Sequence, residues 1–332
     1  MPSSMIRDCM VARTHGIKGI EIHEHEVSMN KQEKLEGVKE YWGDPKEIVD
    51  TLADAEILIV HVAPVTAKVL DAGKDLKLIG CCRSGPVNVD SAYATRKGIP
   101  VIFTPGRNAQ GVADLTIGLL IAEARGIARA DAEMKKGVYG VPQLGIELWG
   151  KTIGIIGLGN VGSMVAYRAK NGFNMKVLAH DPYITKERAK ELGTELVDLK
   201  TLLRESDFVS IHSRPSSDGK PQITAEHIAL MKPTAYLINT ARGNILDEKA
   251  LYKTLKEDKI AGAALDVYAK EPVDPNNPLL KLDNITLTPH IGGTTREVPL
   301  RAAEIIAEDI ARFLKGKKPR NILNPEVYER RK

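Results

Sequence analysis

Short apolar runs rich in β-branched residues alternate with longer segments of helical periodicity along most of the chain. The runs at residues 56–62, 76–82 and 99–104 (EILIVHV, LKLIGCC and IPVIFT) predict buried strands. A second series of strands starts at Lys151 and comprises KTIGIIG, MKVLAHD, FVSIH, AYLINT, IAGAALDV and ITLTPH. This alternation is typical of parallel α/β sheets, whose strands are buried on both faces and joined by helices. Two series therefore predict two doubly wound domains.

The helical pattern predicts a long helix over about 110–136, another over 247–258 and a last one over 301–315. Residues 1–19 contain no convincing opening strand, whereas residues 20–27 (IEIHEHEV) alternate as a strand does. His23 and His25 would share one face of that strand. A metal site would need further ligands, so a solvated strand face is the preferred interpretation and no metal is expected.

Composition narrows the class of protein. The chain has 332 residues and a formal net charge of +4, which is ordinary for a globular protein of two domains. No basic stripe with interleaved aromatic residues predicts nucleic-acid binding. No apolar run approaches a membrane span and no leader pattern is present, so neither a membrane nor secretion is expected. Cys9, Cys81 and Cys82 form no metal or disulfide pattern, and the cytoplasm is the expected compartment.

The segment Gly157-Leu-Gly159-Asn-Val-Gly162 directly follows the strand KTIGII and opens a helical pattern. A GxGxxG sequence alone is weak evidence for a nucleotide site. A strand directly before it and a helix after it make it the fingerprint of a dinucleotide-binding site. Gly157 allows the tight turn, Gly159 lets the backbone approach a pyrophosphate, and Gly162 lets helix and strand pack closely. The helix N-terminus then offers free N–H groups to the phosphates.

Asp181 ends the next strand, at the distance from the glycines where an acidic residue is expected to bind the ribose 2′-hydroxyl. Its negative charge would repel a 2′-phosphate, which favours NAD over NADP. The alternative is that Asp181 caps the turn before Pro182.

Three further residues follow strands of the second series. Arg242 follows AYLINT, Glu271 follows IAGAALDV, and His290 ends ITLTPH. If the sheet is parallel, all three lie on the edge that carries the glycine loop. Reduction of a carbonyl by hydride needs a cation to polarise the C=O, an acid to protonate the oxygen, and a partner for that acid.

The segments ELWGKTIGIIGLGNVG, NTARGNILDEKAL, ALDVYAKEP and TPHIGG stand in the order and at the spacing of one family. The chain resembles the D-isomer-specific 2-hydroxyacid dehydrogenases, in their phosphoglycerate dehydrogenase-like branch, from about residue 56 to 314. The resemblance implies an NAD-dependent oxidoreductase that moves a hydride to or from C2 of a small D-2-hydroxy or 2-keto acid. It leaves 3-phosphoglycerate, glycerate or hydroxypyruvate, and glyoxylate as candidate substrates.

By this resemblance Arg242 orients the substrate carboxylate and carbonyl, His290 is the acid and base, and Glu271 is its carboxylate partner. A planar guanidinium suits a carboxylate because it donates two parallel hydrogen bonds. A carboxylate beside an imidazole stabilises the protonated ring. The resemblance also implies cofactor contacts, and the full expected set is Gly157, Gly159, Asn160, Val161, Gly162, Asp181, His212, Ser213, Thr240, Ala241, Arg242, Asp266, His290 and Gly292.

The rest of the substrate site is expected from the first domain, where LKLIGCC ends in Arg83-Ser84-Gly85-Pro86. Family members carry a longer glycine-rich loop there, so the contact pattern must differ, since proline donates no hydrogen bond. Arg83 either supplies a second cation, favouring a phosphorylated or dicarboxylate substrate, or is a salt-bridged structural residue. Asn108, at the crossing between domains, is expected to reach the substrate as well.

The resemblance finally implies an architecture and an assembly. A Rossmann NAD-binding domain (109–294) would be inserted in a flavodoxin-like substrate domain (1–108 and 295–332). A homodimer is expected, with residues 137–149, which include Tyr139, Leu144 and Trp149, as a candidate dimer arm. The rival hypothesis is an NAD(H)-sensing interaction protein of the corepressor type, which shares the fold and the three candidate catalytic residues.

Overall fold

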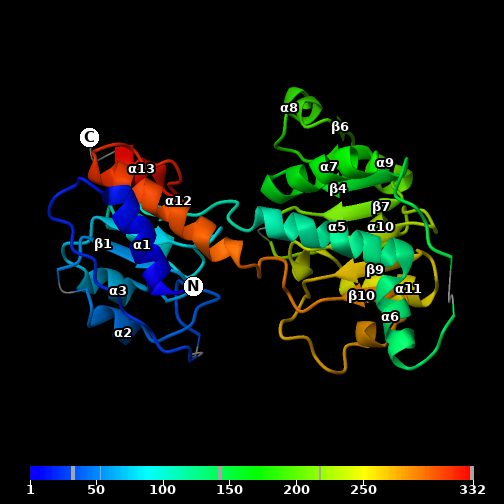
Figure 1. The fold of residues 1–332 in the computed structure, drawn as a ribbon, viewed down its shortest axis with the longest axis horizontal. Coiled ribbons are helices and arrows are strands. Elements are labelled where there is room, and N and C mark those ends of the chain that lie inside the picture. Colours follow the sequence, from blue (N-terminus) through cyan, green and yellow to red (C-terminus); the bar gives the residue numbers. More distant parts are fainter. Residues whose placement is uncertain (31–33, 53, 141–143, 217, 330–332) are drawn as a thin grey trace. The chain divides into compact units, whose positions relative to one another are not determined.

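The computed structural model describes residues 1–30, 34–52, 54–140, 144–216 and 218–329. The chain divides into two compact units (Figure 1). Unit 1 comprises Met1–Arg107 and Thr295–Lys332, and unit 2 comprises Asn108–Thr294. Both units are built around parallel sheets, which confirms the predicted α/β class.

Unit 2 contains a parallel sheet of seven strands in the order β10-β9-β8-β7-β4-β5-β6. The first strand in sequence, β4, lies inside the sheet between β5 and β7, so the strand order reverses beside it. In open parallel sheets, ligands bind outside the carboxyl ends of the strands at such a reversal. The strands are β4 (Thr152–Ile156), β5 (Lys176–His180), β6 (Glu195–Leu196), β7 (Phe208–Ile211), β8 (Tyr236–Asn239), β9 (Gly262–Leu265) and β10 (Ile285–Leu287).

Helices cover both faces of this sheet, because successive strand residues point to opposite faces. Ile155 and Val177 pack with α5 and α7, whereas Ile156 and Leu178 belong to the core on the side of α9, α10 and α11. The helical elements are α5 (Ala109–Arg125), α6 (Ile127–Lys135), α7 (Asn160–Phe173), α8 (Lys186–Glu191), α9 (Leu199–Glu205), α10 (Ala225–Ile228), α11 (Glu248–Lys256) and the 3₁₀ turns η1 (Gly243–Ile245) and η2 (Pro278–Lys281).

The prediction of a single helix over 110–136 is wrong in one respect. The structure has two helices there, α5 and α6, which are separated at Gly126. That residue has φ of 62°, in the left-handed region, and its N–H bonds back to carbonyls of the last turn of α5. Glycine adopts this conformation without the penalty that a Cβ imposes. The apolar periodicity continues across the break, which is why the pattern alone did not reveal it.

Unit 1 has a parallel three-stranded sheet in the order β1-β2-β3. Helices α1 and α12 cover one face of it, with Met10 and Ile306 in their shared core, and α2, α3 and α4 cover the other. Cys81 faces one core and Cys82 the other, and both thiols are buried. The elements are α1 (Ser3–Thr14), α2 (Pro45–Val49), β1 (Ile57–Val60), α3 (Ala67–Ala72), β2 (Leu78–Cys81), α4 (Ser91–Arg96), β3 (Val101–Phe103), α12 (Glu297–Leu314) and α13 (Pro325–Glu329).

The amino-terminal part of unit 1 differs from the prediction. Residues 20–27 form no strand, and helix α1, which was not predicted, precedes them. The helix buries only Met10 and Thr14, so it lacks the broad apolar stripe that would have revealed it. The side chains of residues 20–27 are all exposed or half-buried, so neither face packs on a core. A strand also needs a neighbouring strand to pair its backbone N–H and C=O groups, and this segment is paired with none in the described part of the chain. His23 lies exposed beside Glu21, at 3.7 Å.

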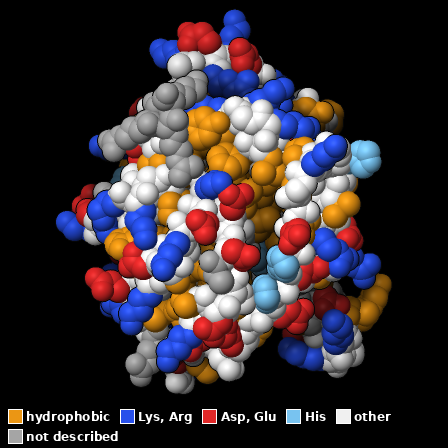
Figure 2. All heavy atoms as spheres, turned by 90° about the vertical axis from the view of Figure 1, so that its left-hand side faces the viewer, with side chains coloured by type: hydrophobic (Ala, Val, Ile, Leu, Met, Phe, Trp, Pro, Cys, Tyr) orange, Lys and Arg blue, Asp and Glu red, His pale blue; other side chains and the backbone are white. Residues whose placement is uncertain are grey.

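The described ranges of the chain lack two features, a membrane-spanning helix and a cluster of metal-binding side chains. Within those ranges, no helix combines the length and apolarity needed to cross a bilayer. Nor does this part of the chain hold three or more His, Cys, Asp or Glu side chains grouped to bind a metal ion. On the face shown in Figure 2, acidic and basic side chains are interspersed, and neither sign forms a continuous field.

The carboxyl-terminal segment is tied to unit 1 by Asn324, which is buried. Its Oδ1 accepts from the N–H of Val101 at 2.8 Å, and its Nδ2 donates to Thr95 Oγ1 at 2.9 Å and to the Ile99 carbonyl at 3.1 Å. Asn324→Ala leaves buried backbone groups unpaired, so we expect the free energy of unfolding to fall by roughly 2–4 kcal/mol. Urea unfolding followed by circular dichroism measures the loss. Asn276→Ala, at an exposed turn, is the control, and equal stability of the two variants would contradict the assignment.

Candidate functional site

The candidate residues of unit 2 lie in the loops that follow its strands. The glycine loop follows β4, Asp181 follows β5, and His212 follows β7. Arg242 and Glu271 follow β8 and β9, and His290 follows β10. Because all these strands are parallel, the structure brings the loops to one edge of the sheet. Arg83, Ser84 and Gly85 follow β2 of unit 1, at the carboxyl edge of that unit's own sheet.

The three glycines of the loop after β4 have different surroundings. Gly157 has φ of 93°, and a Cβ there would lie 2.6 Å from the backbone N of Ser213. A Cβ at Gly162 would lie 2.0 Å from the carbonyl oxygen of Gly157, whereas nothing lies within 4 Å of a Cβ at Gly159. The loop is therefore packed at its first and third glycines and open at its second. Asn160 and Val161 form the first turn of α7, whose N–H groups have no helical partner.

Asp181 fixes this loop from the neighbouring strand. One carboxylate oxygen accepts from the N–H of Leu158 and the other from that of Tyr183, both at 2.8 Å. Asp181 therefore caps its own turn, as the alternative interpretation expects. Each oxygen retains a lone pair for a further donor such as a hydroxyl, so capping does not exclude the ribose contact.

His212 lies at the end of β7, beside the glycine loop. Its Nε2 is 2.8 Å from Ser210 Oγ, and its Nδ1 is buried with no hydrogen-bond partner in the described parts of the chain. Burial lowers the pKa of His212 to about 3, so the ring is neutral near pH 7. The adjacent Ser213 donates from Oγ to Gln222 Oε1 at 3.4 Å. These two residues thus offer polar contacts without charge.

The loop that carries Arg242 is shaped by Asn239, which is fully buried at the end of β8. Its Oδ1 accepts from the N–H of Ala241 and its Nδ2 donates to the Arg242 carbonyl, both at 3.0 Å. The Arg242 side chain is exposed and donates from Nη1 to the Ala241 carbonyl at 2.8 Å. Thr240 turns away, with its hydroxyl 2.8 Å from that of Thr116 on α5. The Thr240 hydroxyl is therefore already engaged with α5, whereas its backbone remains with the Arg242 loop.

Gly243 brings the Arg242 loop against the loop that carries Glu271. A Cβ at Gly243 would lie 1.8 Å from the carbonyl carbon of Tyr268 and 2.4 Å from the N of Ala269. Such distances are impossible for any side chain, so only glycine allows this approach of the two backbones. Arg242 and Glu271 consequently extend from two segments in direct contact.

His290 and Glu271 form a close side-chain pair, with Nδ1 2.7 Å from Oε2. The other carboxylate oxygen accepts from the N–H of Tyr268 at 3.0 Å. The Tyr268 hydroxyl donates to the Thr288 carbonyl at 3.0 Å, which links the Glu271 loop to the His290 loop. Both side chains of the pair remain partly open, at 45% and 36% exposure. The pair can therefore hold a proton on a ring that a ligand can still reach.

Asp266, buried at the end of β9, holds the turn on which His290 lies. Oδ1 accepts from Thr288 Oγ1 at 2.7 Å and from the Ile291 N–H at 2.8 Å, and Oδ2 accepts from the Gly292 N–H at 2.8 Å. His290 itself has φ of 55°, in the left-handed region. The sequence alone predicts Asp266 only as a cofactor contact. Its partners become visible only in three dimensions, because they lie 22–26 residues away.

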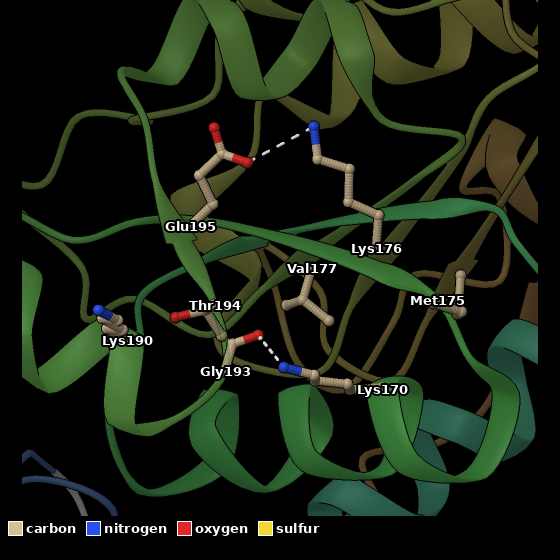
Figure 3. A pocket seen from close by; sticks show the side chains of 8 residues that line it. All are labelled: Lys170, Met175, Lys176, Val177, Lys190, Gly193, Thr194 and Glu195. Atoms are coloured by element: carbon tan, nitrogen blue, oxygen red, sulfur yellow. Dashed lines mark hydrogen bonds and ion pairs between the residues drawn. The ribbon is translucent and has the colours of Figure 1, made fainter.

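A hollow elsewhere on unit 2 has no part in this arrangement (Figure 3). It lies at the amino ends of β5 and β6, the opposite edge of the sheet, and Lys176 and Glu195 start those two strands. Lys176 Nζ is 3.5 Å from Glu195, and Lys170 Nζ donates to the Gly193 carbonyl at 3.1 Å. These contacts hold Lys170 and Lys176 at the edge of the sheet opposite the candidate residues, so the hollow takes no part in their arrangement.

In unit 1, Arg83 is paired rather than free. Its Nη1 donates to the Glu40 carbonyl at 2.6 Å, and its Nη2 is 2.5 Å from the Glu40 carboxylate. This is the arrangement that the salt-bridge alternative predicts. Nothing lies within 4 Å of a Cβ at Gly85, so the loop is open there. Asn108 is the residue before α5, at the start of unit 2.

Comparison with known proteins gives one consistent result. Residues 117–292 match the family model for the D-isomer specific 2-hydroxyacid dehydrogenase, NAD binding domain. The chain is 41% identical over 290 residues to a glyoxylate reductase of Korarchaeum cryptofilum, covering 86% of this chain and 87% of that protein. It is 42% identical over 304 residues to the D-3-phosphoglycerate dehydrogenase of Methanocaldococcus jannaschii, covering 90% of this chain. The chain spans little more than half the length of that enzyme, at 58%.

A solved structure agrees with these sequence matches. The D-lactate dehydrogenase from Aquifex aeolicus, complexed with NAD and lactic acid, superposes with a TM-score of 0.68 at 32% identity. The match covers 85% of this chain and 87% of that one.

Gly157 and Gly159 differ in whether the structure has room for a methyl group. Gly157→Ala places a Cβ against backbone in a left-handed conformation, so we expect the free energy of unfolding to fall by about 2 kcal/mol or more. Gly159→Ala meets nothing, so stability should stay within about 0.5 kcal/mol while the binding of NADH weakens at least roughly tenfold. Thermal unfolding and fluorescence titration with NADH measure the two effects. Tight NADH binding by Gly159→Ala would remove the loop as the pyrophosphate site.

Proposed function

The chain belongs to the D-isomer-specific 2-hydroxyacid dehydrogenase family, and from this premise we propose that it transfers a hydride between NAD and C2 of a small D-2-hydroxy or 2-keto acid. The observation that carries the proposal is the His290–Glu271 pair, at 2.7 Å, on the sheet edge that also holds the glycine loop. An acid–base pair beside a dinucleotide loop is what hydride transfer to a carbonyl requires.

The residues of the loop fit NAD. The open position at Gly159 admits a pyrophosphate, and the free N–H groups at the start of α7 face it. Asp181 retains lone pairs for the ribose hydroxyls, and its negative charge disfavours the 2′-phosphate of NADP. NAD supplies the hydride acceptor or donor. The remaining proposed contacts come from His212, Ser213, Thr240, Ala241, Asp266 and Gly292, with Asp266 able to accept from the carboxamide only in addition to its three internal bonds.

The catalytic roles follow from how each side chain is held. The exposed guanidinium of Arg242 is proposed to bind the substrate carboxylate and polarise the carbonyl, since it can donate two parallel hydrogen bonds. Nδ1 of His290 faces Glu271, so Nε2 is the atom left to deliver a proton to the carbonyl oxygen during reduction and to accept it during oxidation. Glu271 stabilises the protonated ring and fixes its orientation.

The substrate itself remains a choice among 3-phosphoglycerate, glycerate or hydroxypyruvate, and glyoxylate. Ser84, Gly85 and Asn108 are proposed to contact it through backbone or side-chain donors. Arg83 is proposed to act mainly by shaping its loop, because Glu40 already balances its charge. The short loop ending at Pro86 offers fewer N–H donors than a longer glycine-rich loop would.

A homodimer is proposed through the segment that carries Tyr139, Leu144 and Trp149. These side chains are 93%, 88% and 69% exposed, so a partner subunit could cover them. Residues 141–143 of the expected arm lie outside the described residues.

The proposal is tested by NADH oxidation with a panel of 2-keto acids, in the wild type and in His290→Ala. The wild type should turn over at least one keto acid, and NADPH should be a poor substitute. His290→Ala should lower kcat by roughly 10²–10⁴-fold, because the proton donor is gone, while NADH binding persists. Tight NADH binding without turnover of any keto acid would favour the NAD(H)-sensing interaction protein instead.

Glu271→Gln tests the pairing. The amide carries no charge to balance a protonated imidazole, so we expect the pH optimum of kcat for reduction to move downward. The pH profile of kcat, measured beside Glu187→Gln on exposed helix α8 as control, reports the shift. A profile that does not move would argue against Glu271 as the partner of His290.

A further inference from the structure

Helix α5 lies against two of the loops that carry the candidate catalytic residues. It packs on β8, β9 and β10 within unit 2. A Cβ at Gly292, in the loop that carries His290, would lie 3.4 Å from Val112 Cγ2. One turn later on the helix, Thr116 reaches the loop that follows β8. The helix therefore contacts the His290 loop through an apolar side chain and the neighbouring loop through a polar one.

The polar contact is a bond between two buried hydroxyls. Thr116 is fully buried, and Thr240, which directly follows β8, is 6% exposed. Their Oγ1 atoms are 2.8 Å apart. Thr116 Oγ1 is also 2.7 Å from the carbonyl oxygen of Val112, one helical turn earlier. Both hydroxyls are thus removed from water, and each replaces it with a partner inside unit 2.

The direction of the bond follows from the hydrogens that are available. A threonine hydroxyl has one hydrogen, and a carbonyl oxygen can only accept. The hydrogen of Thr116 must point to Val112, because two oxygens 2.7 Å apart without a hydrogen between them repel each other. The hydrogen between the two hydroxyls consequently belongs to Thr240. Thr240 therefore uses Thr116 as its acceptor, whereas Thr116 has its own acceptor within the helix.

This bond fixes the start of the loop that carries Arg242, because Thr240 lies two residues before it. Asn239 holds the same loop from the end of β8, through the N–H of Ala241 and the carbonyl of Arg242. The Thr240 hydroxyl adds an anchor on a different element, 124 residues away in the chain. The Arg242 guanidinium donates to the Ala241 carbonyl, so its direction depends on where this backbone is held.

We propose that Thr116 is a positioning residue for Arg242. By accepting from Thr240 it holds the loop after β8 against α5, and so sets the direction from which the guanidinium meets the substrate. The inference rests on the proposed function, in which Arg242 binds the substrate carboxylate and polarises the carbonyl. Hydride transfer needs the reacting groups in a narrow range of geometry, so a residue that touches no ligand can change the rate.

The kinetic test compares Thr116→Val, which keeps the shape and removes the hydroxyl, with Thr116→Ser, which keeps the hydroxyl. In Thr116→Val we expect KM for the keto acid to rise and kcat to fall, so that kcat/KM decreases roughly 10- to 100-fold. Thr116→Ser should stay within about threefold of the wild type. The matched control is Thr194→Val, which should change neither constant. Thr194 is also buried and donates to the Ala189 carbonyl at 2.9 Å, but it lines the hollow at the opposite edge of the sheet.

The two kinetic constants separate positioning from a purely structural role. A structural role alone would reduce the amount of folded enzyme, which lowers the apparent kcat and leaves KM unchanged. An unchanged KM in Thr116→Val, or an equal loss in Thr116→Ser, would therefore overturn the proposal. A wild type that turned over no keto acid would instead contradict the proposed function.

Urea unfolding tests the bond itself and needs no turnover. Thr116→Val leaves the Thr240 hydroxyl without its acceptor, so this variant should unfold at a lower urea concentration than the wild type. Thr240→Val should have the smaller effect, because Thr116 still donates to Val112. Adding Thr240→Val to Thr116→Val should raise the midpoint again, since the unpaired donor is then gone. If the two losses simply added, the threonines would not be coupled, and the proposal would be wrong whatever the kinetic constants showed.

Discussion

The buried carboxylate of Asp266 is the interaction on which the geometry around His290 depends. A histidine with a left-handed backbone is held in a sparsely populated conformation, at a cost of about 1–3 kcal/mol, and needs surrounding bonds to keep it there. Asp266 provides them by accepting from residues on both sides of the turn. The ring can then meet Glu271 at 2.7 Å without either side chain being buried. The pair can remain open to a ligand because the residue that fixes its turn, Asp266 at the end of β9, is buried and does not cover it.

The three catalytic candidates are joined by backbone contacts as well as by side chains. Gly243 allows the Arg242 loop to touch the backbone before Glu271, and Tyr268 connects that segment to the His290 loop. Each loop comes from a different strand, yet none can shift alone. The loops after strands β8, β9 and β10 therefore hold the three candidate side chains as one unit.

Much of this organisation could be predicted from the sequence. Buried parallel strands are short apolar runs, and the glycines after β4 and the polar residues after β8, β9 and β10 stand beside those runs in the chain. What could not be predicted depends on partners that are distant in sequence. Glu40 and Arg83 are 43 residues apart, and no local pattern shows that one neutralises the other. Helix α1 lacks a clear apolar stripe, and the left-handed break at Gly126 leaves the periodicity around it intact.

The position of the thiols has a consequence for how the two units can be followed separately. All three cysteines of the chain, Cys9, Cys81 and Cys82, belong to unit 1, and burial raises the pKa of the two in and beside β2, so the reactive thiolate is scarce while that sheet is intact. Alkylation of those two side chains therefore requires the sheet of unit 1 to open, whereas opening of unit 2 exposes no sulfhydryl. The rate at which Cys81 and Cys82 are alkylated, followed by mass spectrometry, therefore reports the opening of unit 1 without any label added to the sequence.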